Sequence, residues 1–408
     1  MADGVQVPRR ALAVFHLAAT SGPSRSLEAE LRWLAGEAEL DVVVPGPGAV
    51  AERFGGFARV TELDFEALTL PRGPVVLAAA ARRAAREAAA LRPLIRERRP
   101  ELVVLASAML PAALIAARRE RVPAVVYAGE LFPGAGVDPS GARYRPANAA
   151  RALGGRALAS LTGALADAVL ACSRTVASQY TSARRAEVSV LYPPIPDHSG
   201  GDRGGFRSRL GIGADERCVV ALGNITENRG QDVLIAALPA IRAEVGDARA
   251  VIVGDPHPRP QDLRFRERLV ELASRLGVED AVTFAAHTEA VADVYAAADV
   301  VVNPRRIGEA FGRVPCEALV AGRPVVAMRE GAVPEVLRDG ETALLVSPGH
   351  SGALAAATVR LLEDETLRSR LVAEGRRDVL RRFAPDRSLA EFRRVVGEVA
   401  GARAGGPR

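Results

Sequence analysis

Residues Asn303–Met328 read NPRRIGEAFGRVPCEALVAGRPVVAM, and this stretch decides how the rest of the chain is interpreted. A short apolar strand ends at Asn303, a loop of small and charged residues follows, and a helical run leads to a second apolar strand. Glu309 in the loop and Glu317 in the helical run are separated by seven residues. A loop that opens a helix presents free backbone N–H groups and the positive end of the helix dipole, which together suit a diphosphate group.

The two glutamates admit two interpretations. A carboxylate just before the helix can reach a sugar hydroxyl, and one about two turns inside it can accept hydrogen bonds from a ribose diol. The plainer alternative is a strand–loop–helix unit with two solvated glutamates. The sequence context, in which Glu309 is followed by Ala310-Phe311-Gly312 and then a helix, favours the functional interpretation.

Short apolar runs alternate with amphipathic helical runs along the whole chain. Strands are expected at residues 11–17, 41–44, 102–106, 124–127 and 168–172, and again at 218–222, 250–253, 282–284, 300–303 and 325–327. Strands that alternate with helices indicate parallel sheets covered on both faces, so the predicted fold class is α/β.

The run 191–196 and the polar, Gly-rich stretch 197–205 interrupt this pattern and are the best linker candidates. We therefore predict two doubly wound, Rossmann-like domains, 1–197 and 205–385. Such domains bind ligands at the carboxyl ends of their strands, and we expect the two to face each other across a cleft.

Composition excludes several classes of chemistry. All 54 basic residues are arginine, so no mechanism can use a lysine Schiff base, a pyridoxal phosphate anchor or a Walker A loop. The net charge is +5, but no basic stripe with interleaved aromatic residues indicates nucleic acid binding. Neither a His cluster nor a DxD motif between apolar strands is present, so no metal site is predicted.

The chain shows no sign of export. Its three cysteines have no CxxC spacing, residues 1–10 are polar, and no apolar stretch reaches transmembrane length. We expect a cytoplasmic protein with reduced cysteines.

Five motifs around the two glutamates share their order with those of one enzyme family. They are 223–235 (GNITENRGQDVLI), 251–255 (VIVGD), 282–286 (VTFAA), 294–304 (VYAAADVVVNP) and 330–340 (EGAVPEVLRDG). With Glu309 and Glu317 they resemble the E-x7-E signature and flanking motifs of the retaining glycosyltransferases of family 4 (group 1), which have the GT-B fold. The resemblance covers essentially the whole second domain. The first domain matches only weakly, and chiefly through residues 166–173 (ADAVLACS).

The resemblance implies transfer of a sugar from a nucleoside diphosphate to an unidentified acceptor, with retention and without a metal or cofactor. Glu309 would contact the donor sugar and Glu317 the nucleotide ribose. Arg229 stands where the family usually has a phosphate-binding lysine, and Asn224 stands where it usually has arginine. Either Arg305 or Arg306 could restore the lost charge, or both could be exposed.

In this fold a last helix, about 386–400, would pack back on the first domain. The N–H groups of Phe311 and Gly312 would face the diphosphate, and the segment from Phe284 to His287 would lie near the base. The expected donor-binding residues are Gly22, Asn224, Arg229, Phe284, His287, Glu309, Ala310, Phe311, Gly312, Val314 and Glu317.

The first domain departs from the family pattern. Many members have a histidine after the strand that here covers 123–127, where this chain has Gly129 followed by Glu130. Glu130 is hypothesised to face the cleft and bind the acceptor or act as its base, and the alternative is a polar loop residue. The predicted catalytic residues are therefore Glu309, Arg229 and Glu130. A catalytically weak relative that binds a nucleotide or a partner protein is the alternative function.

The run Ala78–Arg99 (AAAARRAAREAAALRPLIRERR) is basic and has helical periodicity. A basic amphipathic helix of this kind can contact the inner face of a membrane peripherally. The alternative, a solvated arginine face, fits the moderate charge excess better.

Overall fold

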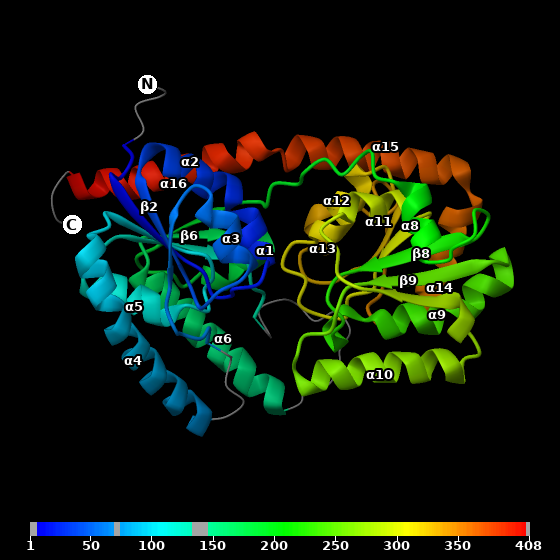
Figure 1. The fold of residues 1–408 in the computed structure, drawn as a ribbon, viewed down its shortest axis with the longest axis horizontal. Helices are drawn as coiled ribbons and strands as arrows, with labels where there is room; N and C mark the ends of the chain where they lie inside the picture. The colour runs from blue at the N-terminus through cyan, green and yellow to red at the C-terminus, as the bar shows by residue number, and fades with distance from the viewer. Residues whose placement is uncertain (1–5, 69–73, 133–145, 405–408) are drawn as a thin grey trace. The chain divides into compact units, whose positions relative to one another are not determined.

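The computed structural model describes residues 6–68, 74–132 and 146–404 (Figure 1). The chain divides into two compact units. The first contains Met1–Pro194 and Pro385–Arg408, and the second contains Ile195–Ala384. Both units have the α/β architecture that the alternating pattern predicts.

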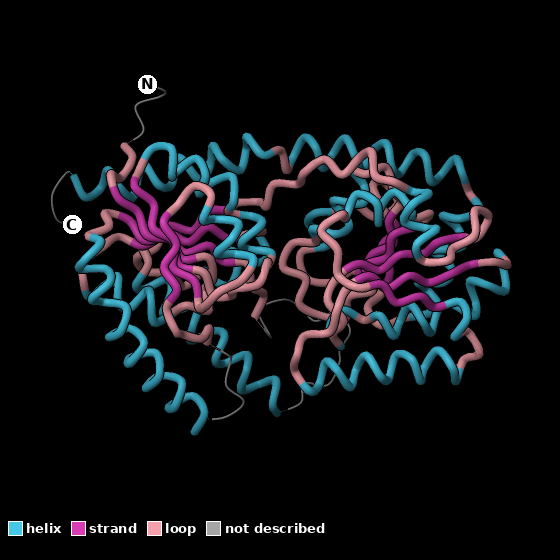
Figure 2. The backbone as a smooth tube through the Cα atoms, in the orientation of Figure 1, coloured by secondary structure: helices cyan, strands magenta, loops and turns pink. Residues whose placement is uncertain are grey.

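A seven-stranded parallel sheet forms the centre of the first unit, with the order β3–β2–β1–β4–β5–β6–β7. The strands are β1 Arg10–Val14, β2 Glu39–Val44, β3 Arg59–Glu62, β4 Leu102–Leu105, β5 Ala124–Ala128, β6 Ala168–Ala171 and β7 Glu187–Val190. The inner strands are almost wholly apolar and buried, as required of a sheet flanked by helices (Figure 2). The direction of winding changes between β1 and β4, where open α/β sheets place ligands.

Eight α-helices belong to the described part of the first unit. They are α1 Gly22–Ser26, α2 Glu28–Glu37, α3 Ala49–Gly55, α4 Pro74–Arg98, α5 Pro111–Arg119, α6 Pro146–Leu165, α7 Arg174–Ala177 and α16 Pro385–Ala404. A short 3-10 turn, Ser178–Tyr180, follows α7.

The last helix, α16, packs on α2 of the first unit. Phe392 is fully buried and meets Trp33 edge-on, with 6.1 Å between ring centroids. Ser388 donates a hydrogen bond of 2.5 Å to the buried carboxylate of Glu30. This element corresponds to the helix predicted at about 386–400, and it extends a few residues further.

The second unit has a six-stranded parallel sheet with the order β10–β9–β8–β11–β12–β13. Its strands are β8 Arg217–Leu222, β9 Ala248–Val253, β10 Val282–Ala285, β11 Val300–Asn303, β12 Val325–Met328 and β13 Leu344–Val346. Its α-helices are α8 Arg203–Arg209, α9 Gln231–Val245, α10 Pro260–Arg275, α11 Val291–Ala297, α12 Arg313–Val320, α13 Val333–Val336, α14 Ser351–Glu363 and α15 Glu365–Arg382. Valine, leucine and isoleucine side chains of the sheet, α9 and α14 form its core.

The sequence-based prediction missed three strands, β3, β7 and β13. All three lie at the edge of a sheet, where one side lacks a neighbouring strand. β3 and β7 are half exposed and carry polar residues, and β13 is only three residues long. β3 and β7 therefore lack the continuous apolar run that marked the central strands, whereas β13 is apolar but short.

The predicted linker 197–205 is part of the second unit. His198 packs against Tyr295 with 5.7 Å between ring centroids, and Asp202 caps α8 by accepting a hydrogen bond from the Gly205 N–H. The unit boundary lies at Pro194–Ile195 instead. The cleft between the domains stays a prediction.

The basic run Ala78–Arg99 forms most of α4. Several of its described arginines are paired with carboxylates: Arg83 with Glu66 and Glu87, and Arg92 and Arg96 with Glu120. These pairs reduce the charge that the helix could offer to an anionic surface. None of the helices in the described ranges combines the length and apolarity needed to span a bilayer.

Replacing Phe392 with alanine is expected to destabilise the first unit by about 3–5 kcal/mol, because it empties a fully buried aromatic site between α16 and α2. Trp33 is the only tryptophan of the chain and touches this ring, so its fluorescence during urea unfolding reports on the first unit. The matched control is Leu161→Ala on α6 of the same unit, where the leucine is 37% exposed. It should change the unfolding free energy by less than about 1 kcal/mol. Equal unfolding midpoints for the two variants would contradict the prediction.

Candidate functional site

Glu309 lies in the loop between β11 and α12, at the carboxyl edge of the second sheet. Its side chain is 12% exposed. One carboxylate oxygen accepts a hydrogen bond of 3.3 Å from the amide of Asn303, the last residue of β11. The same oxygen lies 3.8 Å from Nε of Arg305. The carboxylate is therefore held at the end of the strand by an amide and a cation.

The charge balance keeps Glu309 ionised. Burial by itself raises the pKa of Glu309, but Arg305, Arg229 and hydrogen bonds from Asn303 and the Phe311 N–H outweigh it, so the pKa lies below its ordinary value. Arg305 is only 18% exposed, and it also donates to the carbonyls of Ile307 and Gly308. The alternative in which Arg305 and Arg306 are both exposed is thus wrong for Arg305.

Two glycines allow the backbone to close around Glu309. Gly331 has φ +55°, and a Cβ there would lie 2.2 Å from the carbonyl oxygen of Glu309. Gly230 has φ +69°, and a Cβ there would lie 2.1 Å from the carbonyl oxygen of Pro304. Only glycine combines the left-handed conformation with such close approach.

Arg229 ends a short 3-10 turn, Glu227–Arg229, directly before α9. Its guanidinium packs against Gly223. A Cβ added at Gly223 would lie 3.1 Å from a terminal nitrogen of the Arg229 guanidinium. Burial and the charge of Arg305 lower the pKa of Arg229 to about 10, and Glu309 offsets part of that shift. Arg229 thus remains a cation near neutral pH, and no described carboxylate lies within 4 Å of its guanidinium.

Glu317 lies in α12 and is 4% exposed. The hydroxyl of Tyr295 donates to one carboxylate oxygen at 2.8 Å, and Arg313 donates to the other, with 3.0 Å from its terminal nitrogen. Each oxygen keeps further accepting capacity. Tyr295 was not among the predicted site residues, although it stands in the motif VYAAAD.

The loop that opens α12 has the expected glycine, but one of its N–H groups is already engaged. Gly312 precedes the helix with φ +104°, and Val314 is half-buried in the first turn. The N–H of Phe311 hydrogen-bonds the carboxylate of Glu309 and contributes to its lowered pKa, and its role toward a diphosphate stays a prediction. The ring of Phe311 packs edge-on against Phe383, while Ala310 is half-buried beside it.

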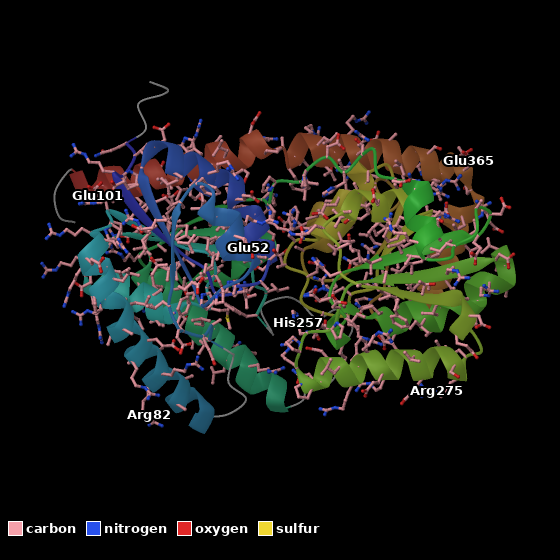
Figure 3. The ribbon with its side chains drawn as sticks, viewed as in Figure 1. Glu52, Arg82, Glu101, His257, Arg275 and Glu365 are labelled. Atoms are coloured by element: carbon pink, nitrogen blue, oxygen red, sulfur yellow. The ribbon has the colours of Figure 1, made fainter. Side chains whose placement is uncertain are left out.

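Asn224 is exposed after β8, and its side-chain nitrogen lies 3.1 Å from Nε2 of His257. His257 belongs to the loop between β9 and α10 (Figure 3). Burial and the charge of Arg259 lower the pKa of His257. His257 is half-buried and contacts a predicted site residue, although no sequence pattern indicated that it belongs to the site.

The segment expected near the nucleotide base forms the edge strand β10 and the following loop. Phe284 is half-buried, and the guanidinium of Arg266 stacks on its ring at 3.4 Å from the centroid. His287 is exposed, with its N–H bonded to Asp255 at 3.2 Å and its ring 3.1 Å from Glu289. The ring face of Phe284 next to Arg266 is thus already covered.

Glu130 lies after β5 at the carboxyl edge of the first sheet. Its carboxylate accepts hydrogen bonds from the hydroxyl of Ser107 and from the N–H groups of Gly129 and Ala108. Burial raises the pKa of Glu130, and these hydrogen bonds offset only part of the shift. Nearby, the hydroxyl of Tyr180 is buried without a hydrogen-bond partner among the described residues.

Gly22 begins α1 and is exposed, and a Cβ added there would meet nothing within 4 Å. The fold therefore does not require glycine at this position. His16, just after β1, has a buried Nδ1 without a partner in the described part of the chain, and burial lowers its pKa to about 4.

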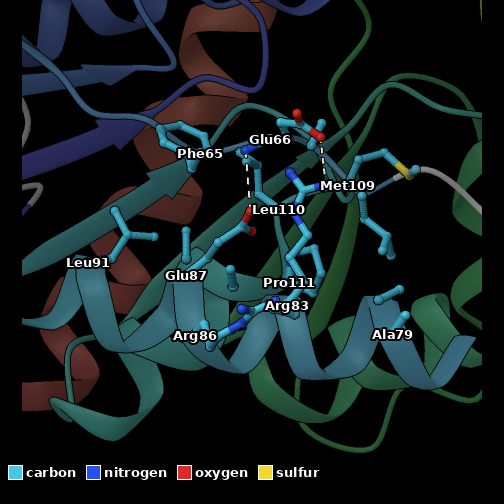
Figure 4. Close-up of a pocket in the computed structure, with 16 residues that line it drawn as sticks. Phe65, Glu66, Ala79, Arg83, Arg86, Glu87, Leu91, Met109, Leu110 and Pro111 are labelled. Atoms are coloured by element: carbon cyan, nitrogen blue, oxygen red, sulfur yellow. Dashed lines mark hydrogen bonds and ion pairs between the residues drawn. The ribbon is translucent and has the colours of Figure 1, made fainter. Parts of the chain in front are cut away.

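The first unit also contains a pocket of about 340 Å³ beside the ends of β3 and β4 (Figure 4). Its lining is mainly apolar and includes Phe65, Leu91 and Met109. Arg83 lies on the α4 side, paired with Glu66 at 2.5 Å and Glu87 at 2.7 Å. The pocket can accept an apolar group beside Arg83, whose charge is already balanced by Glu66 and Glu87.

In the second unit, Arg229 and Glu309 lie within electrostatic range of each other at the carboxyl edge of the sheet, and Glu317 lies in the helix α12 that follows Glu309. Gly22 and Glu130 lie in the first unit. Among the described residues, no group of three or more His, Cys, Asp or Glu side chains is placed to hold a metal ion.

Two family models match the chain in succession. Residues 20–198 match "Glycosyltransferase Family 4", and residues 216–364 match "Glycosyl transferases group 1". The chain belongs to the family 4, or group 1, glycosyltransferases. This family 4 chain has the site residues Arg229, Glu309 and Glu317 inside the second matched segment.

Curated relatives that match part of the chain are named as glycosyltransferases. The chain is 34% identical over 230 residues to D-inositol 3-phosphate glycosyltransferase of Mycobacterium tuberculosis, an alignment that covers 52% of this chain and 45% of the relative. Curated relatives from Mycobacterium bovis match with the same identity and coverage. The chain thus spans less than half the length of the curated relatives that it matches.

The fold is similar to that of Anabaena HepE in complex with UDP and glucose, with a TM-score of 0.75 and 21% identity over 96% of this chain and 99% of the other. It is also similar to sucrose-phosphate synthase of Thermosynechococcus elongatus, with a TM-score of 0.75 and 19% identity over 97% and 100%. These structures show that the family 4 chain has the GT-B fold.

Gly331→Ala is expected to destabilise the second unit more than Gly340→Ala. Both glycines have positive φ, +55° and +72°, which alone costs alanine about 1–2 kcal/mol. At Gly340 nothing lies within 4 Å of the added Cβ, whereas at Gly331 the Cβ would overlap the Glu309 carbonyl. Overpacking should add about 1–3 kcal/mol to the loss in free energy of unfolding for Gly331→Ala. Denaturant unfolding followed by circular dichroism measures the difference, and equal losses for both variants would show that the contact with Glu309 can relax freely.

Glu130→Gln is expected to become more stable relative to the wild type as the pH rises from 5 to 8. The pKa of Glu130 is raised in the folded state above its ordinary value of 4.5, so its ionisation favours unfolding at higher pH. Glutamine removes this titration and keeps a neutral polar side chain. The difference in free energy of unfolding at several pH values tests the prediction.

Glu120→Gln provides the control for this titration. Hydrogen bonds from Arg96 and Arg92 lower the pKa of Glu120, so it stays ionised throughout this pH range. Its substitution should change stability by the same amount at every pH. A pH-independent difference for Glu130→Gln would show instead that Glu130 is ionised in the folded protein.

Proposed function

We propose that this chain is a glycosyltransferase that moves a sugar from a nucleoside diphosphate sugar to an acceptor with retention of configuration. The observation that carries the proposal is the cation of Arg229, which has no carboxylate partner within 4 Å among the described residues and lies within electrostatic range of Glu309. A buried guanidinium of this kind favours an anion as its partner.

The leaving group of such a transfer is a nucleoside diphosphate, which develops negative charge in the transition state. Arg229 and the start of α12, with Gly312 as its first flanking residue, supply positive potential for that charge. Arg305 adds a second, half-buried cation, which takes the place of the charge missing at Asn224. Arginines and a helix N-terminus can together replace a metal ion in this role.

The sugar itself develops positive charge when the diphosphate departs. The carboxylate of Glu309 is ionised because its pKa lies below the ordinary value, so it can stabilise that charge. Glu317 is fixed by Tyr295 and Arg313 and retains accepting capacity for the hydroxyls of a ribose. We assign Glu309 to the sugar and Glu317 to the nucleotide ribose.

On the acceptor side, Glu130 is the proposed base. Burial raises the pKa of Glu130, which makes its carboxylate a better proton acceptor, and Ser107 fixes its orientation. The mainly apolar pocket next to β3 and β4 lies at the same carboxyl edge of the first sheet and suits an acceptor with an apolar part.

UDP-sugars are the first donors to test, because the similar HepE structures contain UDP and UDP-glucose. UDP at 100 times its dissociation constant should stabilise the folded protein by about 2.7 kcal/mol. Arg229→Gln should weaken UDP binding about tenfold or more, since it removes a charged hydrogen-bond donor from the diphosphate. Calorimetric titration and the shift in melting temperature measure both effects.

Arg264→Gln on α10 is the matched control, because Arg264 is exposed and forms no ion pair within the described residues. It should bind UDP as the wild type does. If UDP, GDP, ADP and TDP all fail to stabilise the protein, the transferase proposal is wrong.

A transfer assay with an acceptor panel, run with and without EDTA, tests turnover. The proposal expects equal rates in both and a product whose anomeric NMR coupling matches that of the donor. Nucleotide binding with no transfer and no donor hydrolysis would favour the catalytically weak alternative.

A further inference from the structure

The second unit contains a pocket at the edge of its sheet opposite to the edge where Glu309 lies. It has a volume of about 330 Å³ and is lined where β8, β11 and β12 begin. Because the strands are parallel, this amino edge is separated from the carboxyl edge by the length of the strands. The side chains that matter are Arg203, Arg217, Asp299, Arg323, Arg368 and Ser369.

The pocket has four arginines and one carboxylate, and the carboxylate is already occupied. Asp299 accepts hydrogen bonds from Arg203 at 2.9 Å, from Arg207 at 3.4 Å and from the N–H of Cys218 at 2.7 Å. It cannot neutralise the remaining arginines as well. Arg368 also pairs with Glu365 at 3.4 Å, outside the lining. The excess of positive charge in the pocket therefore lies with Arg217 and Arg323.

Structural roles account for two of the four arginines. Arg203 donates to the carbonyls of Ala296 and Ala297 at the end of α11. Arg368 donates to the carbonyls of Leu361 and Leu362 near the end of α14. Cations at helix C-termini stabilise the helix dipole, so these two residues need no ligand to explain them.

Arg217 and Arg323 have no such explanation. Arg217 is exposed at the first position of β8, and no side-chain hydrogen bond or ion pair joins it to another described residue. Nε of Arg323 is buried and has no hydrogen-bond partner among the described residues. Burial and the charge of Arg203 lower the pKa of Arg323, and Asp299 opposes that shift only in part. The protein thus leaves positive charge uncompensated inside a concave site.

We propose that this pocket is a second ligand site, which binds the phosphate or diphosphate group of a small molecule through Arg217 and Arg323. Guanidinium groups bind phosphate oxygens in bidentate fashion, and a multiply charged anion matches the excess of arginine better than a single carboxylate does. Ser369 offers a hydroxyl donor at the same wall. The volume is at the lower end of the range for small-molecule sites.

Hydrogen exchange with inorganic pyrophosphate as the probe tests this site separately from the proposed donor site. Bound pyrophosphate should slow exchange in peptides that cover residues 203–217 and 320–326. Arg217→Gln/Arg323→Gln should abolish that protection and weaken the corresponding binding about tenfold or more. Arg217→Gln alone, at an exposed position, should weaken it too, which guards against a folding defect caused by loss of Arg323.

Two further variants separate the sites. Arg229→Gln should keep the protection at residues 203–217 and 320–326, because it alters the opposite edge of the sheet, and Arg264→Gln should behave as the wild type. The proposal is overturned if pyrophosphate gives no protection there, or if protection persists in Arg217→Gln/Arg323→Gln. Protection by anionic lipid vesicles or by an oligonucleotide, with none by pyrophosphate, would likewise overturn it.

Discussion

Mutual compensation of buried charges controls the structure of the second unit around Glu309. A carboxylate and two guanidiniums are withdrawn from water at the end of β11, and each would be strongly unfavourable there alone. Arg229 and Arg305 keep Glu309 ionised, and Glu309 in turn keeps Arg229 protonated against burial and the repulsion of Arg305. The loops must approach closely for this to work, which explains why Gly230 and Gly331 have left-handed backbones against neighbouring carbonyls.

Sequence patterns were sufficient for the central strands, because a strand buried on both faces is a continuous apolar run. The strand–loop–helix pattern of residues 303–328 also predicted Glu309 and Glu317, and the family resemblance predicted Arg229 in the separate β8–α9 unit. Their roles at a donor site stay predictions. The partners of these residues could not be predicted in the same way. Arg305 turns inward through hydrogen bonds to its own loop, and Tyr295 reaches Glu317 from a neighbouring helix. Such contacts depend on loop curvature and helix packing, which leave no periodic signal.

The absence of lysine gives arginine every cationic task in this protein. Some guanidiniums close helix ends, as Arg203 and Arg368 do, and others pair with carboxylates on the surface. Arg229 and Arg323 differ from both groups because burial lowers their pKa values and no carboxylate neutralises them directly. Helix α12 separates these two sites, with Gly312 before its first residue and Arg323 shortly after its last. The two cations lie at opposite edges of the same sheet, Arg229 after β8 and Arg323 before β12.

The membership of α16 in the first unit has a consequence for how the chain is made. A ribosome releases the polypeptide from its N-terminus, so Ile195–Ala384 emerges completely before Pro385–Arg408 does. The second unit can therefore acquire its full set of elements while the first still lacks the helix that covers Trp33 and Glu30. Until α16 has emerged, the apolar surface of α2 that it covers stays open to solvent and to chaperones. The first unit is thus completed only after the second.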